Sequence, residues 1–116
     1  MIIFYNPRCS KCREAAGILE ERSCDFEIRE YLKDPPTVKE LRSIVQKLGC
    51  RPQDLVRKSE PLYKEKYEGK KITGAGWLKI LSEHPILIER PIVITDEKAI
   101  IGRPPSLVVD FISRKK

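Results

Sequence analysis

The sequence lacks the long apolar runs and the concentrated charge that mark membrane-spanning and nucleic-acid-binding chains. No apolar run approaches the ~18 residues of a membrane-spanning helix, and the N-terminus has no signal-peptide layout. The formal net charge is +6, but the 23 basic residues are interspersed with 17 acidic ones and form no basic block. We therefore expect a cytoplasmic protein without a membrane or direct nucleic-acid partner, although its positive charge calls for an anionic partner.

The chain is also too short for two domains and has too few cysteine motifs for a zinc module. Its 116 residues suit one domain, residues 1–116, with a real hydrophobic core. Four cysteines in the cytoplasm are expected to be reduced, so the single CxxC motif, Cys9 to Cys12, indicates redox, catalytic or metal chemistry rather than a structural bridge. Because there is no second CxxC, we expect no metal site, and we interpret Cys24 and Cys50 as packing residues.

What the sequence does contain is an alternation of element types. Short β-rich runs predict strands at 2–5, about 26–30, 92–95 and 99–101. Apolar periodicity and capping residues predict helices at 10–22, 37–48, 52–56, 73–84 and from 106 onward. The polar segment 58–72 is weakly patterned and is assigned no element.

This order, β-α-β, a helical middle and then β-β-α, predicts an α/β protein with a thioredoxin-like fold and a mixed sheet. The helical middle is interpreted as an insertion at about 33–88 within the single domain. We expect the first two strands to be parallel, because a right-handed helical crossover joins them.

Cys9 stands where the first predicted strand becomes a helix. Unpaired backbone N–H groups and the positive end of the helix dipole stabilise an anion at such a position. Arg8, Lys11 and Arg13 add positive charge nearby. Each influence favours the thiolate, which is the reactive form of cysteine. Cys9 is therefore a candidate nucleophile, and the same N–H groups can bind an incoming oxyanion.

Cys12 shares a helix face with Ala15, Ala16 and Leu19, and that face is expected to turn toward the sheet. Two roles stay open for it. Cys12 is either a small buried residue with an inert thiol, or the redox partner that resolves an oxidised Cys9. The second role follows from CxxC across a helix N-terminus, which is the spacing of a reversible disulfide.

Three arginines stand at the ends of predicted elements. Arg57 ends the short helix after Pro52, Arg90 precedes the third strand, and Arg103 follows the hairpin. The edges at which strands end are where sites of α/β proteins gather. The planar guanidinium also suits tetrahedral oxyanions. All three are candidate substrate-binding residues.

Together these motifs resemble the glutaredoxin-coupled arsenate reductases, the ArsC family, over almost the whole chain. The stretch YNPRCSKCR is similar to the family's Asn-Pro-x-Cys motif, and its later blocks resemble YLKDPPTVKEL, LVRKSEPLYKE, EHPILIERPIVIT and IGRPPSLVV. By this resemblance Cys9 is the catalytic thiol, and Arg57, Arg90 and Arg103 bind arsenate and its adduct. The resemblance also places Arg90-Pro91 in the loop where thioredoxin-like folds carry a cis proline.

The resemblance implies an oxidoreductase of arsenic detoxification. The Cys9 thiolate would attack arsenate, glutathione would attack the arsenic of the adduct, and a glutaredoxin would take up the glutathione as arsenite leaves. Glutathione is then an electron-donating co-substrate, thioredoxin is the alternative donor, and neither a bound cofactor nor a metal is needed. We expect the protein to be a monomer.

Two departures from the family pattern keep other functions open. Well-characterised members have a histidine immediately before the Asn-Pro, where this chain has Tyr5, and some relatives lack Cys12. A CxxC at this place resembles the Spx-type regulators, which share the fold, bind RNA polymerase and sense thiol oxidation, but which do not keep the arginine set. A redox-sensing transcription regulator and a general CxxC thiol-disulfide oxidoreductase are therefore the alternatives.

Overall fold

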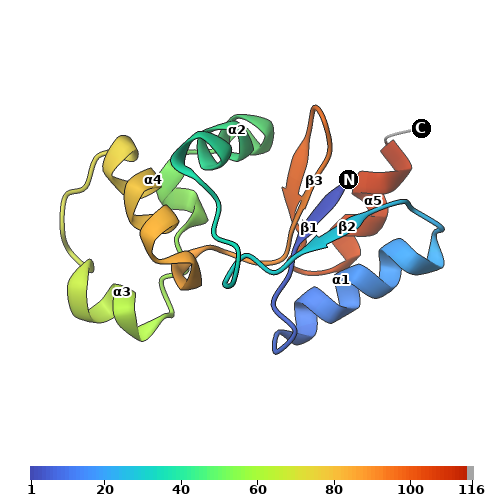
Figure 1. Ribbon diagram of the computed structural model, residues 1–116, viewed down its shortest axis with the longest axis horizontal. Coiled ribbons are helices and arrows are strands. Elements are labelled where there is room, and N and C mark those ends of the chain that lie inside the picture. Colours follow the sequence, from blue (N-terminus) through green and yellow to red (C-terminus); the bar gives the residue numbers. More distant parts are fainter. Residues whose placement is uncertain (115–116) are drawn as a thin grey trace. The chain divides into compact units, whose positions relative to one another are not determined.

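The computed structural model describes residues 1–114, and its elements follow the predicted order. The strands are β1 (Ile2–Phe4), β2 (Glu27–Arg29), β3 (Ile92–Ile94) and β4 (Ala99–Ile101). The helices are α1 (Ser10–Glu21), α2 (Val38–Leu48), α3 (Pro61–Lys66), α4 (Gly74–Glu83) and α5 (Ser106–Arg114) (Figure 1). Two 3-10 helices are η1 (Pro52–Leu55) and η2 (Pro85–Leu87).

The strands form one mixed sheet in the order β2-β1-β3-β4. β1 is parallel to β2, as predicted, and antiparallel to β3, while β3 and β4 form an antiparallel hairpin. This β-α-β unit followed by a hairpin and a helix is the thioredoxin-like arrangement, so the predicted fold class is confirmed. Within residues 1–114, no helix combines the length and the apolar character needed to cross a membrane.

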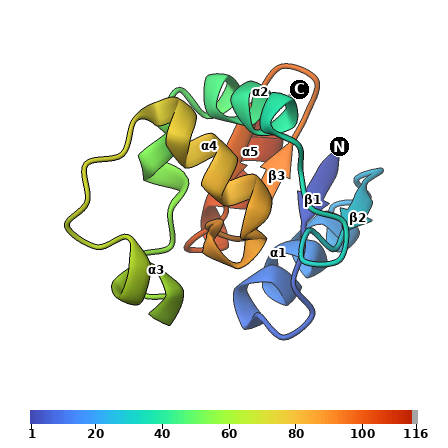
Figure 2. The same ribbon diagram turned by 60° about the vertical axis from the view of Figure 1, so that its left-hand side comes forward.

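The chain divides into two compact units, residues 1–34 with 90 onward, and residues 35–89. In the first unit, α1 and α5 lie side by side on one face of the sheet (Figures 1 and 2). The apolar stripe of α1 meets the two central strands there, as its periodicity predicts. The buried cluster consists of Ile3, Ala15, Ala16, Leu19, Val93, Val108 and Ile112.

In the second unit, α4 packs against α2, η1 and η2. The predicted capping box is present, because the Thr37 hydroxyl accepts from the Glu40 N–H at 3.1 Å and the Glu40 carboxylate accepts from the Thr37 N–H at 3.0 Å. α2 ends at Gly49, whose φ of 67° lies in the left-handed region that glycine tolerates. Thr73 caps α4 by accepting from the Gly76 N–H at 3.0 Å.

The segment 58–72, to which the sequence pattern assigned no element, contains α3. No residue of α3 is buried, so the segment has no apolar stripe from which a periodicity could be read. The helix begins at Pro61, a residue that suits the first helical position, and its Tyr63 ring stacks on Trp77 with 6.2 Å between the ring centroids. That contact between distant positions in the chain is invisible to a local pattern.

Candidate active site

Three of the predicted site residues lie in connections that meet at the same end of the sheet, where β1 and β2 have their carboxyl ends. These two strands are parallel, so their carboxyl ends lie together. β3 pairs Ile92 with Phe4, which places the amino end of β3 there, and β4 pairs Ile101 with Ile92, which places its carboxyl end there. The candidate residues in these connections are Cys9, Arg90 and Arg103.

A tight turn after β1 presents Cys9 to the helix that follows. The Cys9 N–H donates to the Asn6 carbonyl at 2.9 Å, and the Asn6 side-chain oxygen accepts from the Arg8 N–H at 3.0 Å. Cys9 is then the N-cap of α1, with the extended backbone angles φ −95° and ψ 116°. Its side chain therefore lies beside the first-turn N–H groups that have no partner within the helix.

The surroundings of Cys9 favour its thiolate. Burial, at 7% exposure, would raise the pKa of this thiol. The Cys12 N–H and thiol and the Arg90 guanidinium outweigh burial and lower the pKa of Cys9 to about 7. Arg103 Nη2 lies 3.7 Å from Cys9 Sγ. The sulfur is consequently poised to ionise near neutral pH with two guanidinium groups beside it.

The positive charge that lowers the pKa of Cys9 comes from Arg90, and not from the sequence neighbours predicted for this role, Arg8, Lys11 and Arg13. Arg13 Nη1 donates to the Pro7 carbonyl at 2.7 Å, and Lys11 Nζ lies 3.6 Å from a carboxylate oxygen of Glu14. Both are therefore engaged elsewhere. The cations beside the sulfur come instead from the far end of the chain, which only the folded sheet brings to Cys9.

The turn after β4 fixes Arg103. Gly102 donates its N–H to the Pro91 carbonyl at 2.8 Å, and a Cβ at Gly102 would lie only 2.9 Å from Val108 Cγ2. Glycine is therefore required for this close approach. Arg103 Nε in turn donates to the Arg90 carbonyl at 3.1 Å, which joins the two arginine loops.

Both arginine loops contain a cis peptide bond. The Arg90–Pro91 bond is cis, as the resemblance implied, and the Arg103–Pro104 bond is also cis. Each proline directly follows one of the two arginines beside Cys9.

Cys12 is fully buried, on the α1 face that Ala15, Ala16 and Leu19 share. Burial, together with the neighbouring Cys9 thiol, raises the pKa of Cys12 to about 12. Cys12 therefore stays protonated at neutral pH, and its S–H can serve as a donor toward the Cys9 sulfur. Its role as a redox partner stays a prediction.

Arg57 belongs to the other unit, residues 35–89. Its backbone N–H donates to the Leu87 carbonyl at 2.7 Å, and its Nε lies 3.4 Å from a carboxylate oxygen of Glu60. The side chain is thus held by its own unit, and its part in binding substrate stays a prediction. Within the described residues, no group of three or more His, Cys, Asp and Glu side chains is placed to hold a metal ion.

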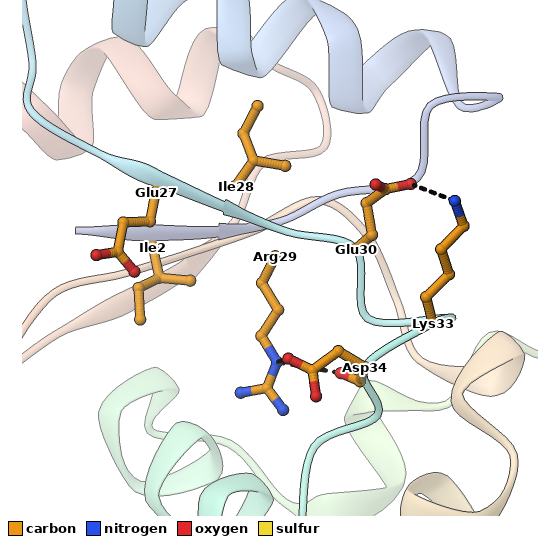
Figure 3. Close-up of a pocket in the computed structure, with 7 residues that line it drawn as sticks. All are labelled: Ile2, Glu27, Ile28, Arg29, Glu30, Lys33 and Asp34. Atoms are coloured by element: carbon orange, nitrogen blue, oxygen red, sulfur yellow. Dashed lines mark hydrogen bonds and ion pairs between the residues drawn. The ribbon is translucent and has the colours of Figure 1, made fainter.

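A hollow of about 460 Å³ on the outer edge of the sheet contains none of the predicted site residues (Figure 3). It is lined by β2 and the turn after it. Figure 3 shows Arg29 directed toward Asp34, and Lys33 toward Glu30. Arg29 Nε donates to the Asp34 carbonyl at 3.1 Å and lies 3.4 Å from its carboxylate. These two ion pairs engage both cations of the hollow, and none of the predicted site residues lines it, so we do not assign it a substrate.

Comparison with known proteins finds relatives that match over most of the chain. Residues 4–111 match the model that describes the ArsC family. The chain is 41% identical to an arsenate reductase of Haemophilus influenzae, over 97% of this chain and 98% of that protein. It is 42% identical to an arsenate reductase of Neisseria meningitidis, over 88% of this chain and 89% of that protein. The solved structure of an arsenate reductase from Vibrio cholerae superposes with a TM-score of 0.89 at 38% identity, covering 94% of each chain.

Proposed function

This chain belongs to the ArsC family, and from that membership we propose that it is an arsenate reductase whose nucleophile is Cys9 and whose electrons come from glutathione through a glutaredoxin. The observation that carries the proposal is the 3.7 Å contact between Arg103 Nη2 and Cys9 Sγ. An oxyanion bound to that guanidinium would have its central atom next to the sulfur. The Cys9 thiolate and the Arg103 guanidinium would then hold the nucleophile and the oxyanion next to each other.

The arginines would act first. Arg90 and Arg103 lie beside the sulfur and would hold the arsenate oxygens through charge-assisted hydrogen bonds. We propose Arg57 as the third such residue, on the resemblance of the LVRKSEP stretch to the family's block. As the Cys9 sulfur attacks, charge grows on the oxygens, and donors that are already in place stabilise it without reorganisation.

The bonds and electrons of the proposed reaction can be accounted for with thiols alone, without a bound cofactor. The Cys9 thiolate forms a sulfur–arsenic bond while one arsenic–oxygen bond breaks, and that oxygen leaves as water after protonation. Glutathione displaces a second oxygen from the arsenic. A glutaredoxin thiolate then attacks the glutathione sulfur, so the electron pair of that sulfur–arsenic bond stays on arsenic and reduces it from As(V) to As(III). Hydrolysis releases arsenite and restores Cys9.

The regulator and the general disulfide oxidoreductase are not favoured as alternatives. Relatives that span 97% and 88% of this chain have the name arsenate reductase. A general disulfide mechanism needs only Cys9 and Cys12 and gives the guanidinium groups of Arg90 and Arg103 beside the sulfur no role. We propose the cytoplasm as the compartment, because the mechanism requires reduced thiols.

The testing experiment is an arsenate-dependent NADPH oxidation assay with glutathione, glutathione reductase and a glutaredoxin. We expect turnover that is lost when arsenate or the glutaredoxin is omitted, and that thioredoxin with its reductase does not restore. Turnover with thioredoxin alone would overturn the donor assignment and leave the reductase. No turnover with either donor would overturn the arsenate reductase proposal.

A further inference from the structure

Tyr31 lies in the connection after β2, at the same end of the strands as Cys9, and no local sequence motif points to it. Its side chain is fully buried. The ring stacks on Phe4 with 5.7 Å between the centroids and 14° between the planes. The Arg29 guanidinium lies 5.5 Å from the centroid of the Phe4 ring, and Asp34 holds Arg29 in turn (Figure 3). The orientation of the Tyr31 ring is therefore fixed by its neighbours.

The Tyr31 hydroxyl is buried in the candidate active site with no acceptor for its proton. Its oxygen is inaccessible to solvent, and no described residue forms a well-aligned hydrogen bond with it. The Arg90 guanidinium lies near enough to act on it as a donor, and the thiols of Cys9 and Cys12 also act on it. A guanidinium has no acceptor, so Arg90 cannot take the hydroxyl proton. A buried hydroxyl in this state costs free energy, and native proteins usually satisfy such a group.

The hydroxyl nevertheless keeps its proton at neutral pH. Burial raises the pKa of Tyr31 to about 12, even though the positive charge of Arg90 acts to lower it. Tyr31 therefore offers a neutral O–H donor at a site whose other donors are cations. Such a donor needs an acceptor that arrives from outside, and an anionic oxygen is the strongest acceptor available to it.

We propose that Tyr31 is a further substrate-binding residue, whose hydroxyl donates a hydrogen bond to an oxygen of the tetrahedral oxyanion that Arg90 and Arg103 hold beside Cys9. This inference rests on the proposed function, since it names a new contact of the same site. The bound oxyanion supplies the acceptor that the buried hydroxyl lacks, and the hydroxyl directs one oxygen while the arginines balance the charge.

The experiment compares Tyr31→Phe with its parent in a Cys9→Ser background, where arsenate binds without reacting. Isothermal titration with sodium arsenate measures the affinity. Because Phe keeps the ring that stacks on Phe4, only the donor is lost, and we expect the Kd for arsenate to rise by about 10-fold or more. The matched control is Tyr63→Phe, which removes a hydroxyl from a ring stacked on Trp77 in the other unit and should leave the Kd unchanged.

Thermal unfolding separates this role from a structural one. Since no described residue accepts the hydroxyl proton in the unliganded protein, Tyr31→Phe should have a Tm equal to or above that of its parent. In protein that retains Cys9, the pH at half-maximal iodoacetamide labelling of Cys9 should not change, because the hydroxyl acts on the ligand. A lowered Tm with an unchanged Kd, or a shifted labelling pH with an unchanged Kd, would overturn the proposal.

The outcomes also separate this inference from the proposed function. If the Cys9→Ser parent binds arsenate and Tyr31→Phe binds it equally well, only the Tyr31 assignment is wrong. If the parent binds no arsenate and the wild-type protein does not reduce it, the proposed function fails and the Tyr31 assignment falls with it.

Discussion

Cys9 and Cys50 are identical side chains next to opposite ends of two helices. Cys9 is the N-cap of α1, whereas Cys50 follows Gly49, the C-cap of α2. Burial by itself would raise the pKa of both thiols. At Cys9, N–H and S–H donors and the Arg90 guanidinium outweigh burial, and the pKa falls to about 7. At Cys50, the Asp54 carboxylate adds to the effect of burial, and the pKa is raised.

The difference shows that a thiol becomes reactive through the groups that surround it. Cys9 is buried and Cys50 is half-buried, and each is next to a helix end. What differs is the sign of the neighbouring charge, positive at the start of α1 and negative at the end of α2, where carbonyl groups and Asp54 oppose a thiolate. The following predictions test whether this difference in charge around Cys9 and Cys50 controls thiol reactivity and arsenate turnover.

The largest effect on turnover is expected when the thiol is removed at Cys9, and removal at Cys50 is the control. Cys9→Ser should lower arsenate turnover by about 10³-fold or more, because the nucleophile is lost. Cys50→Ser should keep turnover within about twofold, since this half-buried thiol takes no part in the reaction. The NADPH-coupled assay measures both. A folded Cys50→Ser protein as inactive as Cys9→Ser would reverse the assignment of the nucleophile.

The next effect tests the positive charge beside Cys9. Arg103→Ala should reduce arsenate turnover by about 10²-fold, the loss expected for one charge-stabilising donor. The control is Arg22→Ala at the other end of α1, an exposed residue at the C-cap, which should leave turnover unchanged. Circular dichroism should show both variants folded. Normal kinetics in Arg103→Ala would remove the contact on which the proposed function depends.

The pH dependence of thiol labelling measures the contrast directly. Because the pKa of Cys9 is about 7, about half of this thiol is ionised at pH 7. Burial and the Asp54 carboxylate raise the pKa of Cys50, so this thiol stays protonated at that pH. Iodoacetamide should therefore label Cys9 several-fold faster than Cys50 at pH 7, and the difference between the two rates should narrow as the pH rises. Peptide mass spectrometry after timed labelling gives both rates, and equal rates would contradict the contrast.

The smallest effect is expected at Cys12. Cys12→Ala removes the S–H donor and leaves the backbone N–H, so the pKa of Cys9 should rise slightly and turnover should stay within about threefold. A disulfide mechanism requires both thiols. Turnover with glutathione and a glutaredoxin, measured beside thermal unfolding, is the readout. A stable Cys12→Ala protein as inactive as Cys9→Ser would contradict a mechanism in which Cys9 is the only reacting cysteine. It would favour the redox-sensing regulator or the disulfide oxidoreductase instead.

Local chemistry made much of the fold predictable. The stripe that includes Cys12 and Leu19 predicted the buried face of α1, and the Thr37–Glu40 pair predicted the start of α2 through contacts within one turn. α3 escaped prediction because its contact partner, Trp77, lies outside the segment and no residue of the helix is buried. The cis bond at Arg90–Pro91 could be anticipated only from the family resemblance, because generic X-Pro bonds are cis only about 5–6% of the time.

The sequence by itself identified Cys9 as the candidate nucleophile, because the Asn-Pro turn and the helix start are both encoded within a few positions of Cys9. Only the tertiary structure decided which cations serve that thiol. Arg103 is 94 residues away in the chain and reaches Cys9 because strand register brings the turn after β4 back to the carboxyl end of β1. Likewise, only the folded sheet places the hydroxyl of Tyr31 beside Arg90. Electrostatic interactions depend on distance in space, and the pairing of strands sets those distances.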